Sequence, residues 1–141
     1  SAVLHSKKFF RACRDLLADG GIFVTQNGVP FQHPDHLAKT TQLLAGLYRH
    51  VSPFFCTQPC YFGGEFALNW ASDQDAALKV DAATLKRRQR SRKITTNYWT
   101  PELHGGAFAL PQYAQDVVDK AITKGRQKPA KRTAARRKAG G

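Results

Sequence analysis

The feature that most constrains the fold is the stretch 54–72, which reads FFCTQPCYFGGEFALNWAS. Apolar and β-favouring residues fill both halves, and Gly63 and Gly64 between them allow a tight turn. We therefore predict two strands joined at a Pro-x-Tyr-x-Gly-Gly corner. Neither half alternates between apolar and polar residues, which predicts strands covered by helices on both faces. Tyr61 lies at the corner, where it either contacts a ligand through its hydroxyl or only packs in the turn.

The residues before this stretch predict a helix and then a strand. Residues 3–18 place apolar side chains at helical spacing, and the Asp-Gly-Gly sequence at 19–21 is typical of a left-handed helix C-cap. Residues 22–26 form a short apolar run, so this region predicts half of a β-α-β unit whose first strand would precede Ser1. Gln26 lies at the carboxyl end of that strand, where open α/β sheets bind ligands. Its side chain either contacts a ligand or forms hydrogen bonds to the loop backbone.

A second helix is expected from His33 to about His50, and its start raises the question of a metal site. His33 and His36 have the spacing of a metal-binding pair, but no third ligand follows at a suitable spacing. We interpret them as solvated histidines. Cys56 and Cys60 would share one face of a strand, and we expect buried structural thiols rather than a redox or zinc pair.

The remaining segments predict shorter elements. Residues 73–79 suggest a short helix or turn, and residues 81–93 predict a helix with a basic end, which is either a solvated face or a nucleic-acid site. Pro101 is typical of the first turn of a helix. The last helix is expected to start at Pro111 and to fade near Ile122.

The net charge of +12 is concentrated at the end of the chain. Residues 124–141 carry eight Lys and Arg residues, no acidic residue, and no aromatic or large aliphatic residue. Such a segment cannot bury enough apolar surface to fold, so we predict a disordered basic tail after a folded domain of residues 1–123. Three cysteines, no signal-peptide pattern and no membrane-spanning stretch favour a cytoplasmic location and no membrane partner.

Five motifs in this order resemble the C-terminal half of a polyamine aminopropyltransferase, most closely a bacterial spermidine synthase. They are DGGIFVTQNG at 19–28, QPCYFGG at 58–64, FALNWASD at 66–73, YWTPELH at 98–104 and the segment 107–113. The resemblance covers about residues 1–122. It implies an α/β fold, namely the C-terminal half of a Rossmann-like, class I methyltransferase-type sheet with flanking helices and an antiparallel final strand.

The resemblance also implies a reaction and its ligands. The family transfers the aminopropyl group of decarboxylated S-adenosylmethionine, its co-substrate, to putrescine and needs no metal. Gln26 and Tyr61 match residues that contact the polyamine. Glu65 departs from the family pattern and either places a carboxylate near the substrate amine or points to solvent, while Trp70 matches a large apolar residue that packs in the core or lines the substrate site.

Tyr98 and His104 match residues that orient a loop over the sheet, and Trp99 replaces a usual tyrosine. The resemblance places no catalytic residue in this chain, because the glycine-rich nucleotide loop, the acidic ribose-binding residue and the general base would all precede Ser1. We therefore expect the chain to be a fragment or one member of a split pair, inactive alone. The complete enzyme is expected to be a homo-dimer or homo-tetramer.

Two alternatives differ in class from an enzyme. The chain could be a non-catalytic partner subunit built on the same scaffold. It could also contact nucleic acid through residues 124–141, whose eight cations would release counterions from phosphates without reading the sequence. The tail has no aromatic residue for base stacking, which weakens the second alternative.

Overall fold

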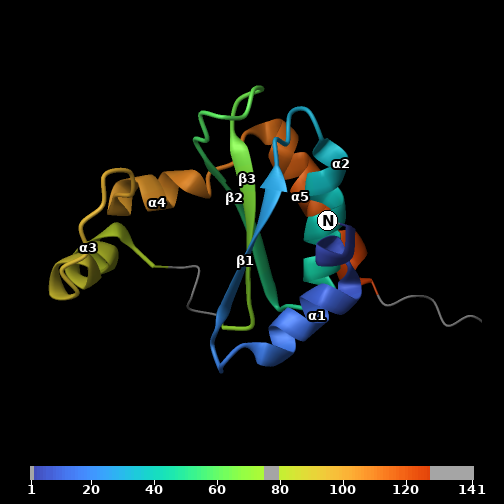
Figure 1. The fold of residues 1–141 in the computed structure, drawn as a ribbon, viewed down its shortest axis with the longest axis horizontal. Coiled ribbons are helices and arrows are strands. Elements are labelled where there is room, and N and C mark those ends of the chain that lie inside the picture. Colours follow the sequence, from blue (N-terminus) through green and yellow to red (C-terminus); the bar gives the residue numbers. More distant parts are fainter. Residues whose placement is uncertain (1, 75–79, 128–141) are drawn as a thin grey trace, which may run out of the picture.

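The computed structural model describes residues 2–74 and 80–127 and shows a mixed α/β fold with a small sheet (Figure 1). A short 3-10 helix at Ala2–His5 precedes the other elements. In chain order these are α1 (Lys7–Leu16), β1 (Ile22–Gly28), α2 (Pro34–Ala45), β2 (His50–Cys56), β3 (Phe66–Ser72), α3 (Ala82–Ser91), α4 (Pro101–Ala107) and α5 (Gln112–Arg126). The helix or turn expected at 73–79 and the tail expected to be disordered lie largely outside the described residues.

The sheet has the strand order β1-β3-β2, with β3 antiparallel to both neighbours. β1 and β2 therefore run parallel to each other, and α2 connects them. The predicted corner is confirmed, because β2 and β3 pair antiparallel from Cys56 and Phe66 outward. Gly63 and Gly64 have φ values of +107° and +102°, which residues with a side chain rarely adopt. The expected antiparallel final strand is confirmed as well.

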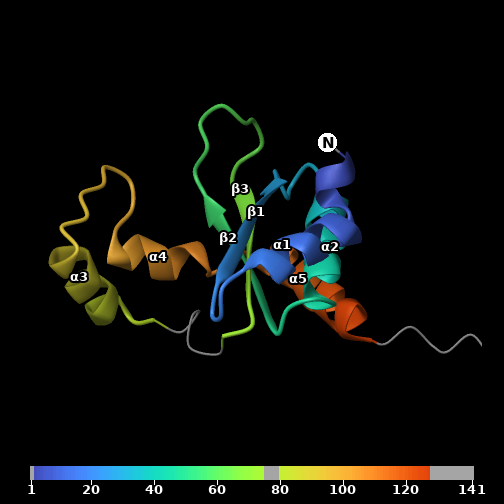
Figure 2. The same ribbon diagram turned by 60° about the horizontal axis from the view of Figure 1, so that its bottom comes forward.

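The helices lie in two groups. Helices α1, α2 and α5 cover one face of the sheet, whereas α3 and α4 extend from its other side (Figures 1 and 2). The apolar core lies under the first group and has two clusters of buried side chains. One contains Phe10, Leu44, Tyr48, Val51 and Ala71, and the other contains Leu37, Phe55, Ala67, Ala114 and Val118.

The predicted burial on both faces is correct for β3 but wrong for β2. Burial alternates along β2, where Val51, Pro53 and Phe55 are buried and the residues between them are only partly buried. The reason is that β2 is an edge strand of the described sheet, and α4 covers its second face only in part. β1 forms the other edge of the described sheet, and Ile22 and Val24 on it are about half exposed.

Several boundaries differ from the expected ones because local caps end helices that apolar spacing would extend. Ser6 starts α1 by accepting a hydrogen bond from the backbone N–H of Phe9, so the expected helix at 3–18 divides into two. α2 ends at Ala45, before Gly46, and His50 already belongs to β2. α5 continues to Arg126, so the expected domain boundary at 123 falls inside this helix.

Close packing against α2 explains why α5 is longer than its apolar residues suggest. Gly125 in the last turn of α5 lies against the carbonyl oxygen of Gln42 and the side chain of Ala45, and a Cβ at this position would overlap both. The glycine therefore permits the two helices to approach closely. Lys124 and Arg126 also favour the helix, because they place positive charge at its C-terminus.

Candidate functional site

Three of the candidate residues lie on one face of the sheet. Ala67 and Ala71 of β3 pack in the clusters under α1, α2 and α5, so alternation directs Phe66, Leu68 and Trp70 to the opposite face. Gln26 of β1 is paired with Leu68 and shares that face. The Tyr61 ring stacks on Phe66 with centroids 4.9 Å apart and ring planes 24° apart. The fold thus gathers Gln26, Tyr61 and Trp70 on the side of α4.

The polar groups of Gln26 and Tyr61 are available to a ligand. Gln26 is exposed, and Tyr61 is 49% exposed. In the described part of the chain neither side chain makes a hydrogen bond to a protein group. Gln26 therefore presents an amide and Tyr61 a phenolic hydroxyl. Both residues lie near the end of the sheet where β1 and β2 end and β3 begins, an end that can be seen in Figure 1.

Trp70 lines an apolar cavity of about 310 Å³ between the sheet and α4. Its side chain is 6% exposed, so it packs as the sequence suggested and also forms the wall of this cavity. Val24 and Phe54 of the sheet and Trp99 and Phe108 beside α4 complete much of the lining. Sequence reasoning missed Phe54 and Phe108, because nothing in an apolar run distinguishes residues that face a cavity from residues that face the core.

The loop before α4 is held over the sheet by side-chain hydrogen bonds. The Tyr98 hydroxyl accepts a hydrogen bond from the backbone N–H of Thr57 at 2.9 Å. The indole N–H of Trp99 donates to Nδ1 of His104 at 3.3 Å, and burial lowers the pKa of His104. These contacts give Tyr98 and His104 the predicted structural role, and Trp99 takes part in it as well.

Glu65 lies beyond the corner, next to the start of α5. It is exposed and lines a second cavity of about 190 Å³ under α4. Burial raises the pKa of Tyr113, and the negative charge of Glu65 raises it further. Tyr113 meets the ring of Phe31 edge to face, with centroids 6.1 Å apart. No sequence motif predicts this neighbourhood, since its members are far apart in the chain.

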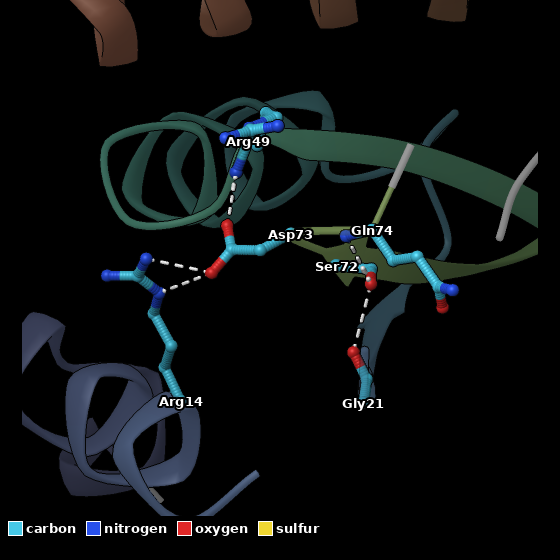
Figure 3. Close-up of polar contacts among 6 residues, drawn as sticks. All are labelled: Arg14, Gly21, Arg49, Ser72, Asp73 and Gln74. Atoms are coloured by element: carbon cyan, nitrogen blue, oxygen red, sulfur yellow. Dashed lines mark hydrogen bonds and ion pairs between the residues drawn. The ribbon is translucent and has the colours of Figure 1, made fainter. Parts of the chain in front are cut away.

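The opposite end of the sheet is fixed by Asp73 (Figure 3). One carboxylate oxygen of Asp73 accepts hydrogen bonds from Nε and Nη2 of Arg14 at 2.9 and 2.8 Å, and the other accepts from the backbone N–H of Arg49 at 2.8 Å. Partial burial raises the pKa of Asp73, but the hydrogen bonds from Arg49 and Arg14 outweigh that effect and leave it below its ordinary value. The contact ties α1 to the end of β3 and is structural.

The cysteines and histidines do not form a metal centre within the described residues, where no three or more His, Cys, Asp and Glu side chains gather. Cys60 is exposed in the corner loop and Cys56 is only partly buried, so the expectation of two buried thiols on one strand face is wrong. The chain leaves β2 at Cys56 and turns before Cys60. Burial raises the pKa of the Cys56 thiol.

Over residues 2–74 and 80–127, no helix has the length and apolar character needed to cross a bilayer.

The sheet order, with the last strand inserted antiparallel between two parallel ones, defines an α/β fold of the kind solved in spermidine synthases. A spermidine synthase in complex with the transition state analogue AdoDATO superimposes with a TM-score of 0.75 and 20% identity, over 85% of this chain and 40% of that one. The spermidine synthase from Thermotoga maritima gives a TM-score of 0.74 and 21% identity, with the same coverage.

Sequence comparison defines the family. Residues 1–82 match the model of the spermine/spermidine synthase domain. The polyamine aminopropyltransferase of Pectobacterium carotovorum is 38% identical over 118 residues, which are 84% of this chain and 41% of that protein. Polyamine aminopropyltransferase 1 of Pseudomonas aeruginosa is 37% identical over the same shares of both chains. The chain therefore belongs to the spermine/spermidine synthase family, and it spans about two fifths of the length of these relatives.

Proposed function

We propose that this chain is part of a spermidine synthase and supplies part of its polyamine pocket. The observation that carries the proposal is the placement of Gln26 and Tyr61, whose polar groups have no partner among the described residues and lie on one face of the sheet near the corner. Trp70 adds an apolar wall on the same face. An amide oxygen, a phenol and an indole suit a diamine, because aromatic rings pack on methylenes and the oxygens accept hydrogen bonds from ammonium ends.

In the proposed reaction, an amine nitrogen of putrescine attacks the aminopropyl carbon that is bonded to the sulfonium sulfur of decarboxylated S-adenosylmethionine. The N–C bond forms, the C–S bond breaks with its electron pair going to sulfur, and the amine loses a proton to a base. The products are spermidine and methylthioadenosine. Gln26 and Tyr61 would hold the diamine so that its nitrogen lies in line with the carbon, which lowers the entropic part of the barrier.

We further propose that the chain alone does not catalyse this transfer. The family resemblance assigns the nucleotide loop and the general base to segments that have no counterpart in this sequence. Those groups would come from the rest of a longer protein or from a second chain, and the complete enzyme would associate as a dimer or tetramer. The nucleic-acid alternative rests on residues 124–141 alone, and the family comparisons do not favour it.

Putrescine binding tests the proposal directly. Ligand-observed NMR on the full 141-residue chain should show binding that becomes roughly tenfold weaker in Gln26→Ala and in Tyr61→Phe, since each loses a hydrogen bond to a charged group. Gln127→Ala, just past the end of α5, is the matched control and should bind like the parent. Equal binding by all four proteins would disprove the site. Spermidine formed by the isolated chain from both substrates would disprove its inactivity.

A further inference from the structure

The two cavities under α4 adjoin each other. The 310 Å³ cavity beside Trp70 and the 190 Å³ cavity beside Glu65 share Phe55, Cys56, Tyr98, Leu103 and Ala107. Tyr98 stands between them and is fixed by its hydrogen bond to Thr57. Side by side between β2 and α4, the two cavities provide a space in the size range of small-molecule sites.

The two ends of this space differ in chemistry. The larger end is lined by aromatic and aliphatic side chains, and its one titratable imidazole, His104, already accepts the indole N–H of Trp99. Glu65 is the one charged residue in the lining of the smaller end. Within the described residues no cation and no hydrogen-bond donor engages its carboxylate, although the chain carries a net charge of +12.

We propose that this space is a second amine site, which binds a primary ammonium bearing an aryl or short alkyl tail. The ammonium pairs with Glu65, and the tail lies against Trp70, Trp99 and Phe108. A carboxylate at the rim and an apolar interior complement such a cation, because each part of the ligand leaves water for a matching partner. A diamine fits poorly, since its second ammonium would be buried at the apolar end without an acceptor. The site shares the Trp70 wall with the proposed polyamine pocket but differs from it in its polar group, because Gln26 and Tyr61 are not in its lining.

The two tryptophans of the chain, Trp70 and Trp99, both line the larger end, so tryptophan emission reports directly on occupancy. The probe is 2-phenylethylamine, and its neutral counterpart 2-phenylethanol separates tail binding from charge recognition. We expect saturable emission changes in the 141-residue chain, with the amine bound about tenfold more tightly than the alcohol.

Three variants test the assignment of the two ends. Glu65→Gln should weaken amine binding about tenfold, to the level of the alcohol, and leave alcohol binding unchanged. Asp35→Asn removes one charge from an exposed carboxylate in the first turn of α2 and should bind both probes like the parent. Ala107→Leu fills the part shared by the two cavities and should abolish binding of both probes.

The proposal is overturned if millimolar 2-phenylethylamine leaves the emission unchanged, or if Glu65→Gln binds it as tightly as the parent. Gln26→Ala separates this site from the proposed polyamine pocket. It should weaken putrescine binding and leave 2-phenylethylamine binding intact, so either site can fail while the other stands. Loss of 2-phenylethylamine binding in Gln26→Ala would contradict the existence of two sites.

Discussion

The Tyr98 hydroxyl accepts a hydrogen bond from the backbone N–H of Thr57, 41 residues earlier in the chain, at 2.9 Å. This bond fixes the loop before α4 to the end of β2 and so shapes both cavities. Tyr98→Phe should lower the free energy of unfolding by about 1 kcal/mol, because it leaves one backbone donor without its partner. Urea unfolding followed by tryptophan emission measures the change. Tyr61→Phe removes a hydroxyl that has no hydrogen-bond partner among residues 2–74 and 80–127, and it should leave stability within about 0.5 kcal/mol of the parent.

The carboxylate of Asp73 predicts a dependence of stability on pH. Its pKa is lower in the folded chain than in the unfolded chain, so its contribution is present above the unfolded pKa of about 4 and is lost as the pH falls through the folded value. Asp73→Asn should cost about 1 kcal/mol or less at neutral pH, since the ion pair with Arg14 is partly exposed.

The measurement for Asp73 is urea unfolding of the parent and the variant between pH 2 and pH 7. The stability difference between them should shrink below pH 4 and remain constant above pH 5. Asp35→Asn, which changes the same net charge without breaking an ion pair in the described structure, is the control. A difference between parent and Asp73→Asn that does not change with pH would contradict the assigned role.

Glycine at position 125 predicts a steric effect. Gly125→Ala should destabilise the chain by about 1–3 kcal/mol, because its methyl group meets the Gln42 carbonyl oxygen and the Ala45 side chain across the α2–α5 contact. Gly106→Ala in α4 is a matched control, since a Cβ there meets no atom within 4 Å. That substitution should stabilise α4 by up to about 1 kcal/mol through helix propensity. Thermal unfolding of both variants shows whether the steric cost of the methyl group or the gain in helix propensity dominates at position 125.

The buried pair Thr41 and Asn69 predicts non-additive effects. The Thr41 hydroxyl donates to the Asn69 side-chain oxygen at 3.2 Å, and the Asn69 amide nitrogen is buried without a partner in the described structure. Thr41→Val and Asn69→Leu should each cost about 1–3 kcal/mol, because Thr41→Val leaves a polar partner unpaired and Asn69→Leu also changes a packed side chain. The double variant should be more stable than the sum of the two costs predicts. Strict additivity in a double-mutant cycle would show that the bond contributes nothing.

Much of the fold could be predicted from the sequence because local signals specify it. The corner required glycines with positive φ, and Gly63 and Gly64 provide them. The sequence could not show that Arg14 meets Asp73, since such a contact depends on how α1 packs against the sheet. The extension of α5 was missed for the same reason, because the close fit of Gly125 is a property of two helices together.

The candidate site was only partly predictable. Gln26 and Tyr61 were identified by motif, and pairing of the strands brought them to one face, which the motif alone did not establish. The cavity beside Trp70 and the neighbourhood of Glu65 and Tyr113 were not predictable, because they are made by segments that meet only in the folded chain.

The central position of β3 has a consequence for the order in which the chain can fold. β1 and β2 each pair with β3 and not with each other in the described sheet, yet β3 is the last of the three to be synthesised. Until residue 72 has left the ribosome, the two earlier strands lack the partner that they have in the described sheet, and their backbone groups remain open to other strands. Hydrogen exchange during refolding should therefore show protection of β1 and β2 arising together with that of β3, in a single cooperative step.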